Sequence, residues 1–298
     1  MASVSRVFRV AFVELSAAVR NRRAVVTTLL FAAVAVAVMY GTISAFAAME
    51  QEVLRGLGLP PSENPGAVTM TLWKSKPFTR IISNLAGNSL VFADIAGRHP
   101  IVLAYALFIF HIVPLLTLIV SAPRVASDLR SGAARYWLVR VTRTEWSFGL
   151  FFGEALMIAV AMLVGAAAAW GTAAWRLGGA DLLLVGSGLL DWSARAWVYA
   201  FAWLGLFMGL SHIAKSGGKA TALAVLGMMG AAAWTPMLRN VSEWLAWAPH
   251  LDILVPQSSI GLLWRRSLSA FLLGVVQLSA LAFTYLLAGV AVFRRRDV

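Results

Sequence analysis

The 298-residue chain contains no cysteine, so disulfide bonds, thiol chemistry and cysteine metal sites are excluded. It is also poor in charge, because Asp, Glu, Lys and Arg make up only 13% of the residues, about half of the usual fraction. Apolar residues account for 60%, and the mean hydropathy is +0.79. A chain of this composition cannot cover itself with polar surface, so it is predicted to be an integral membrane protein.

Motifs for catalysis are missing as well. Gly218-Lys219 is followed by Ala220 and lacks the earlier glycine of a phosphate-binding loop, G-x-x-x-x-G-K-[ST]. The sequence holds no Ser-His-Asp set, no H-E-x-x-H motif and no paired metal-ligand spacing. We therefore expect a chain that is not itself an enzyme and that binds no cofactor or metal.

Six apolar segments are long enough to cross a bilayer core of about 30 Å as helices, which takes about 20 residues each. Alternating strand patterns are absent, and a helix satisfies its own backbone hydrogen bonds in lipid. We predict an all-α protein in which an N-terminal segment, 1–23, precedes one transmembrane domain, 24–298. The predicted spans are about 24–47, 100–121, 147–174, 193–213, 218–237 and 268–292.

The N-terminal segment predicts an amphipathic helix that lies on the membrane surface. Apolar residues recur at helical spacing on one face, and Arg6, Arg9 and Arg20 occupy the rest. This pattern fits either a plain basic anchor or an elbow helix that also contacts a cytoplasmic partner. The predicted apolar face consists of Val4, Phe8, Ala11, Phe12, Leu15 and Val19.

Lys and Arg are distributed unequally between the two sides of the membrane. An even number of spans puts both termini on one side, and that side receives 15 of the 25 basic residues. Because short cytoplasmic loops accumulate Lys and Arg, we predict cytoplasmic termini and a multi-pass protein of the bacterial inner membrane. The net charge of +12 then reflects topology rather than nucleic-acid binding. The 15 residues are Arg6, Arg9, Arg20, Arg22, Arg23, Arg124, Arg130, Arg135, Arg140, Arg143, Lys215, Lys219, Arg294, Arg295 and Arg296.

Two large loops on the opposite side, about 48–99 and 238–267, are too apolar to be flexible linkers. Both are interrupted by prolines, and each contains several aromatic residues. We predict short interfacial or re-entrant helices in these loops. At the same side of the membrane, Asp191 and Arg195 lie four residues apart and predict a local ion pair.

Ionisable residues inside the predicted spans are candidates for function, because placing them in lipid is costly. Glu154 lies about two turns into the third predicted span. Three interpretations are open: a functional acid, an acid near the lipid headgroups, or an ion-pair partner of Lys215 or Lys219. His111 lies in the second span, where Pro114 predicts a kink.

Two G-x-x-x-G pairs allow close helix packing. They are Gly149 with Gly153 and Gly205 with Gly209. The spacing is compatible with packing inside one chain and with a dimer interface.

The stretch between the second and third spans, 124–143, combines five arginines, one acid, one glycine and an amphipathic aromatic run. Its composition fits two interpretations equally: a segment that docks on a soluble partner, and an ordinary basic loop that lies on the lipid headgroups. We predict a short helix over 128–143, parallel to the membrane, with Trp137 and Leu138 as its apolar anchor. The candidate docking residues are Asp128, Arg130, Gly132, Arg135, Trp137, Leu138, Arg140 and Arg143.

The layout resembles the permeases of the ABC-2 transporter family: an interfacial helix, a long outer loop, a charged inner loop and four further spans. The family has an acid, then Gly-Thr-Leu, then a Ser-Arg pair after its second span. Here Asp128, Gly132-Ala133-Ala134 and Thr142-Arg143 stand at these places. Glu154, after Gly153, departs from the family's lysine. Within the family, the chain is most similar to permeases that serve nitrous oxide reductase maturation.

This resemblance implies a permease subunit of an ABC transporter. Two copies of a separate cytoplasmic ATPase would bind ATP and Mg, and the candidate docking residues would receive their movement. A second permease copy or a paralogue would complete the path through the membrane, surrounded by lipid.

Two other functions stay open. The chain could act as a mechanical transmitter that drives an extracytoplasmic partner while no substrate crosses, which the large apolar outer loops fit. It could also be a secondary transporter without an ATPase, although few charged residues lie inside its spans.

Overall fold

The computed structural model describes residues 2–20, 22–58, 60, 98–177, 182–241 and 247–295. Every regular element among these residues is helical, and no strand occurs among them. Six helices are long and apolar enough to cross a membrane, so the predicted all-α architecture with six spans is confirmed. They are α2 (Arg23–Gly56), α6 (Pro100–Ser121), α9 (Arg143–Leu177), α10 (Leu182–Ile213), α11 (Gly217–Val241) and α13 (Leu268–Arg294).

Several helices continue beyond the predicted spans. α2 runs on to Gly56, α9 begins at Arg143 and α10 begins at Leu182. Hydropathy identifies only the part of a helix that suits lipid, whereas the backbone hydrogen bonds continue through the polar layers on either side. The predicted boundaries therefore fall inside the helices.

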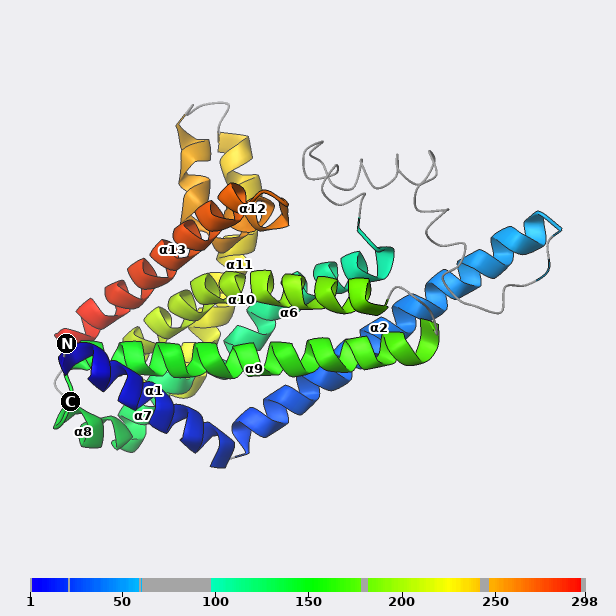
Figure 1. Cartoon of the computed structure of the whole chain (residues 1–298). Helices are drawn as coiled ribbons and strands as arrows, with labels where there is room; N and C mark the ends of the chain where they lie inside the picture. Colours follow the sequence, from blue (N-terminus) through cyan, green and yellow to red (C-terminus); the bar gives the residue numbers. More distant parts are fainter. Residues whose placement is uncertain are drawn as a thin grey trace.

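The helix α10 lies at the centre of the bundle, where it packs against α6, α9, α11 and α13 (Figure 1). Its buried face carries large aromatic side chains, among them Trp192, Tyr199 and Trp203. Each buried ring of this kind contributes a large contact area and strongly stabilises the packing. α10 is thus the element through which the other spans contact one another.

Both G-x-x-x-G pairs serve packing inside the chain. A Cβ at Gly205 would overlap the backbone of α13 at Ala282, and one at Gly209 would overlap it at Tyr285. A Cβ at Gly153 would lie 3.2 Å from the carbonyl oxygen of Ala11. The first pair therefore brings α1 (Ala2–Arg20) onto α9, and the second brings α13 onto α10.

The helix α1 divides its apolar residues between two faces. Val10 and Ala11 are buried against the bundle, whereas Phe8 and Phe12 are 62% and 71% exposed. Arg22, with a φ of 58°, forms the left-handed turn that leads from α1 into α2. The predicted single apolar face is thus split, with one part on the chain itself and the other available to lipid.

Two ends of the bundle can be distinguished along α10. Asp191 and Ser211 are 20 residues apart on this helix, which is about 30 Å and matches the thickness of the hydrocarbon layer. Near Ser211 lie α1, the helix α8 (Ala133–Leu138) and both termini, at the lower left of Figure 1. We call this the α8 end, and the opposite one the α12 end, after α12 (Ile260–Trp264).

Short helices occur at the α12 end, in the described part of the second predicted outer loop, and their interfacial or re-entrant placement stays a prediction. η1 (Ala248–Leu254) and η2 (Pro256–Ser259) precede α12 in the chain. Residues 61–97, which make up most of the first outer loop, lie outside the described residues, so the same prediction for that loop stays a prediction.

Candidate functional site

Two short helices follow α6 at the α8 end. They are α7 (Arg124–Ser131) and α8, and Gly132 joins them with a φ of 76°. This left-handed conformation is unfavourable for residues with a Cβ, which explains the glycine at this position. The predicted single helix over 128–143 is therefore wrong, because the chain turns at Gly132 and again after Leu138.

The helix α8 presents a different apolar pair from the predicted one. Tyr136 and Val139 are 83% and 87% exposed, whereas Trp137 and Leu138 are half-buried and pack against the hydrophobic core. A helix of six residues is too short for periodicity to fix which side faces outward. A partner that approaches α8 meets Tyr136 and Val139 first.

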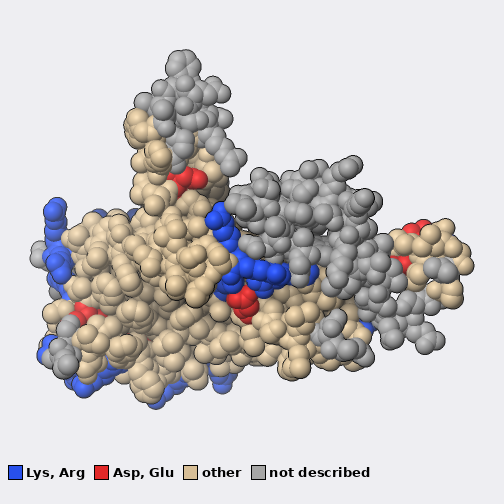
Figure 2. Space-filling model, turned by 45° about the horizontal axis from the view of Figure 1, so that its top comes forward, with Lys and Arg blue, Asp and Glu red and all other residues tan. Residues whose placement is uncertain are grey.

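Arginines surround this apolar pair. Arg130, Arg135 and Arg140 are exposed, and Figure 2 shows Lys and Arg along the left and lower edges of the molecule, at the α8 end. Arg143 differs, because its guanidinium donates to the carbonyl oxygen of Phe293 at 2.6 Å and lies over the Phe293 ring. Besides being a candidate docking residue, Arg143 therefore links the start of α9 to the end of α13.

A hollow of about 480 Å³ lies beside α8. Its lining combines aliphatic side chains with two guanidinium groups, so it suits a partner segment that carries both an apolar and an acidic group. The lining residues are Arg135, Leu138, Val139, Val141, Thr142 and Arg143.

The turn from α8 into α9 is held by a capping box, which the predictions from sequence did not include. The Thr142 backbone N–H donates to Glu145 Oε2 at 2.8 Å, and the Glu145 N–H donates to Thr142 Oγ1 at 3.2 Å. The spacing Thr-x-x-Glu before an apolar run is a sequence signal for this motif. The exposed face of α8 is thus fixed relative to the third span.

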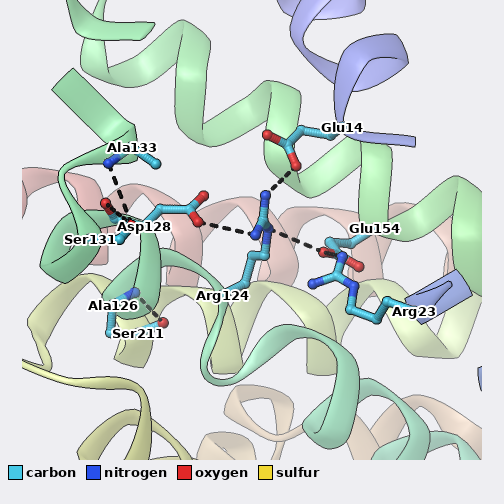
Figure 3. A network of polar contacts seen from close by, with 9 residues as sticks. All are labelled: Glu14, Arg23, Arg124, Ala126, Asp128, Ser131, Ala133, Glu154 and Ser211. Atoms are coloured by element: carbon cyan, nitrogen blue, oxygen red, sulfur yellow. Dashed lines mark hydrogen bonds and ion pairs between the residues drawn. The ribbon is translucent and has the colours of Figure 1, made fainter. Parts of the chain in front are cut away.

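Beneath α1 lies a group of five charged side chains, the Arg124 cluster (Figure 3). Arg124 on α7 forms ion pairs with Glu14 on α1 and with Asp128, whose Oδ1 lies 3.0 Å from Arg124 Nη1. Arg124 Nε also lies 3.7 Å from Glu154 Oε1 on α9. Arg23 on α2 forms a close ion pair with the same Glu154.

The Arg124 cluster corrects the prediction for Glu154. This acid lies where α1 crosses α9, and its partners are Arg23 and Arg124 rather than Lys215 or Lys219. It is only 3% exposed, so compensation by two guanidinium groups explains how an acid can be buried there. The partners are 131 and 30 residues away in the sequence, and no local pattern could have identified them.

The ion pairs of the Arg124 cluster connect α7 to α1 and α9, and through Glu154 to α2. A further contact attaches α7 to α10, because the backbone N–H of Ala126 donates to Ser211 Oγ at 3.1 Å. Removing one partner from a buried ion pair leaves an uncompensated charge and costs about 3–5 kcal/mol. The short helix α7 is therefore connected directly to α1, α9 and α10, and through Glu154 to α2.

His111, the second predicted intramembrane candidate, lies on the outside of the chain. It is exposed on α6, and its Nδ1 lies 2.7 Å from the carbonyl oxygen of Leu107 in the same helix. The structure therefore keeps it apart from the Arg124 cluster. Among the described residues, no group of three or more His, Asp and Glu side chains is placed to hold a metal ion.

A comparison with known families identifies the architecture. Residues 9–298 match the family model described as ABC-2 family transporter protein. The chain belongs to this family. No curated protein matches it individually. An ABC-2 permease is a multi-pass membrane subunit that works with an ATP-binding-cassette ATPase, and permeases of this family are typically not catalytic. The narrower resemblance to nitrous oxide reductase maturation permeases stays a prediction.

Proposed function

We propose that this ABC-2 permease couples ATP hydrolysis by a separate cytoplasmic ATPase to the export or movement of a substrate across the bacterial inner membrane. The ATPase, in two copies, binds ATP and Mg, and this chain supplies the path and the contact surface. The α8 end faces the cytoplasm in this proposal. The excess of Lys and Arg on the side of the termini supports that orientation, as does the position of both termini beside α8.

The observation that carries the proposal is an exposed apolar pair, Tyr136 on α8 and Val139 directly after it, on a segment that is tied to the spans. Exposed aromatic and aliphatic side chains amid arginines are typical of protein docking surfaces, where a few apolar anchors supply most of the binding energy. The neighbouring arginines, Arg130, Arg135 and Arg140, would guide an acidic partner surface toward them. Trp137 and Leu138, next to the pair in the chain, pack against the buried core.

The Arg124 cluster then carries movement from the docking surface to the spans. When nucleotide binding shifts the ATPases, α7, α8 and the start of α9 move together, because Gly132 joins α7 directly to α8 and the capping box holds α8 on α9. Arg124 transmits this shift to α1, α2 and α9 through its carboxylate partners. Rigid-body movement of packed elements is an established way to switch access to a membrane path.

A second permease copy or a paralogue completes the path. Leu107, Leu115 and Ile119 are 48%, 43% and 63% exposed, and with His111 they form a stripe along α6. A histidine that faced lipid in mid-span would be costly, so this stripe is better placed against protein or a polar path. We therefore propose that the α6 stripe faces the second copy.

Binding to the ATPase tests the docking surface. The double variant Tyr136→Ala/Val139→Ala is expected to weaken ATPase binding about 30-fold, because a truncated anchor costs about 2 kcal/mol. Leu183→Ala is the matched control, since Leu183 is also 83% exposed but lies at the α12 end. Copurification and stimulated ATP turnover are measured after reconstitution. Unchanged binding in the double variant would rule out α8 as the docking surface.

Flux measurements distinguish transport from mechanical transmission. Proteoliposomes that hold the complete complex should move substrate only with ATP. Stimulated ATP turnover with no flux of any candidate substrate would instead favour a transmitter that drives an extracytoplasmic partner.

A further inference from the structure

The α12 end carries a second hollow of about 480 Å³, between the start of α6, the first turns of α10 and the segment between α12 and α13. Its lining is mixed. Arg98, Asp191, Ser187 and Arg266 supply polar groups, and Val102 and Leu184 supply aliphatic surface. Figure 2 shows Lys or Arg residues next to Asp or Glu residues near the middle of the view.

One carboxylate organises the basic groups of the hollow. Asp191 Oδ2 lies 2.8 Å from Arg98 Nη1, and its Oδ1 lies 2.8 Å from Arg195 Nε. The Arg98 guanidinium also lies over the Trp192 ring, 5.0 Å from its centroid. These contacts hold Arg98 in one orientation, so a ligand would not have to order a flexible side chain.

The two arginines that Asp191 contacts differ in their other contacts. Arg195 is 8% exposed, and it also donates to the carbonyl oxygens of Leu263 and Arg265 at 2.6 and 2.9 Å. Its donors therefore hold α12 against α10. Arg98 lines the hollow, and a guanidinium carries five N–H donors, so its contact with Asp191 leaves donors for a second acceptor.

Among the described residues at this hollow, basic groups outnumber acidic ones. Arg98 and Arg266 line it, Arg195 lies behind it, and Asp191 is the acidic residue among the described lining residues. Arg266 is exposed at the opening. A surplus of guanidinium groups at a partly apolar hollow favours an anion, and guanidinium geometry suits the oxygens of a phosphate group.

We propose that this hollow binds the phosphate group of an anionic phospholipid. The α12 end lies about 30 Å along α10 from the α8 end, at the depth where headgroups meet the hydrocarbon layer. Leu183 and Leu184, 83% and 58% exposed on the first turn of α10, lie beside it and provide a surface for acyl chains. A free phosphate ion would make no use of this aliphatic surface.

The lipid site depends neither on the ATPase nor on which end faces the cytoplasm. It requires only that the α12 end lies at a headgroup layer. Its failure would therefore leave the proposed coupling function untouched, and failure of the coupling function would leave this site untouched.

The test is a titration of the full, delipidated chain in neutral detergent with phosphatidylglycerol, with bound lipid counted by native mass spectrometry. Phosphatidylcholine and inorganic phosphate are titrated in parallel. We expect Arg98→Gln and Arg266→Gln each to weaken phosphatidylglycerol binding about tenfold, since each removes a charged hydrogen-bond donor. Arg55→Gln is the matched control, because Arg55 is 76% exposed and pairs with Glu52 at the far end of α2.

Arg266→Gln keeps the test valid if Arg98→Gln disturbs folding, because Arg266 is exposed and lies outside the Asp191 ion pairs. Selective loss in these variants, with Arg55→Gln unchanged, supports the site. Equal binding in Arg266→Gln and Arg55→Gln would overturn it. Binding of inorganic phosphate with the same arginine dependence, but without phosphatidylglycerol binding, would overturn the lipid as the ligand.

Discussion

The two ends of α10 carry charged groups that are organised in opposite ways. At the α8 end, three carboxylates enclose two guanidinium groups beneath α1, and Glu154 and Asp128 are 3% and 9% exposed. At the α12 end, one carboxylate holds two arginines beside an open hollow, and Arg266 stands at its rim.

The contrast separates a mechanical role from a binding role. Charges that satisfy one another inside the protein connect helices and resist their separation, because breaking one contact leaves the others uncompensated. A hollow whose described residues include more basic than acidic groups favours a ligand of negative charge. We therefore propose that the same residue types transmit movement at one end and recognise an anion at the other.

Removing the central guanidinium of the Arg124 cluster should cause the largest loss of stability. Arg124→Gln leaves three carboxylates with Arg23 alone, and we expect a loss of about 3–5 kcal/mol in stability. The midpoint of thermal unfolding in detergent should fall clearly. Arg130→Gln removes the same charge from an exposed position on the same short helix, and a change within about 0.5 kcal/mol is expected.

Equal unfolding midpoints for Arg124→Gln and Arg130→Gln would contradict the account of this end. The cluster would then be a set of loosely placed surface charges, and the contrast with the α12 end would disappear.

A smaller loss of stability is expected from a substitution at the contact between α13 and α10, the helix that runs from one end of the bundle to the other. A Cβ at Gly205 overlaps the backbone of Ala282, so Gly205→Ala must push the helices apart and cost about 1–3 kcal/mol. At Gly171 nothing lies within 4 Å of the position that a Cβ would take, so Gly171→Ala should be neutral or stabilise α9 slightly. Thermal unfolding of both variants checks the difference, and similar midpoints would argue against tight α10–α13 packing.

Local sequence patterns predicted the elements well. Hydropathy located the spans, and the four-residue spacing of Asp191 and Arg195 predicted their ion pair, which the structure confirms. Each of these features depends on neighbours within one helix. The capping box at Thr142 and Glu145 has an equally local signal, although the predictions did not include it.

The candidate site could be predicted only in part, because its contacts are distant in sequence. Glu14 and Arg124 are 110 residues apart, so their pairing depends on how α1 crosses the bundle. Tyr136 rather than Trp137 is exposed because of the rotation of a six-residue helix, and Gly132 and the start of α9 set that rotation. Tertiary packing decides both, and composition alone cannot reveal it.

The most direct test of the central claim is the accessibility of position 136 in this cysteine-free chain. Tyr136→Cys should resist a membrane-impermeant thiol reagent in intact cells, react in inverted vesicles stripped of the ATPase, and be protected again when the ATPase is restored. Ser269→Cys, exposed at the start of α13, should react in intact cells. Labelling of Tyr136→Cys in intact cells, or labelling that the ATPase leaves unchanged, would contradict the account.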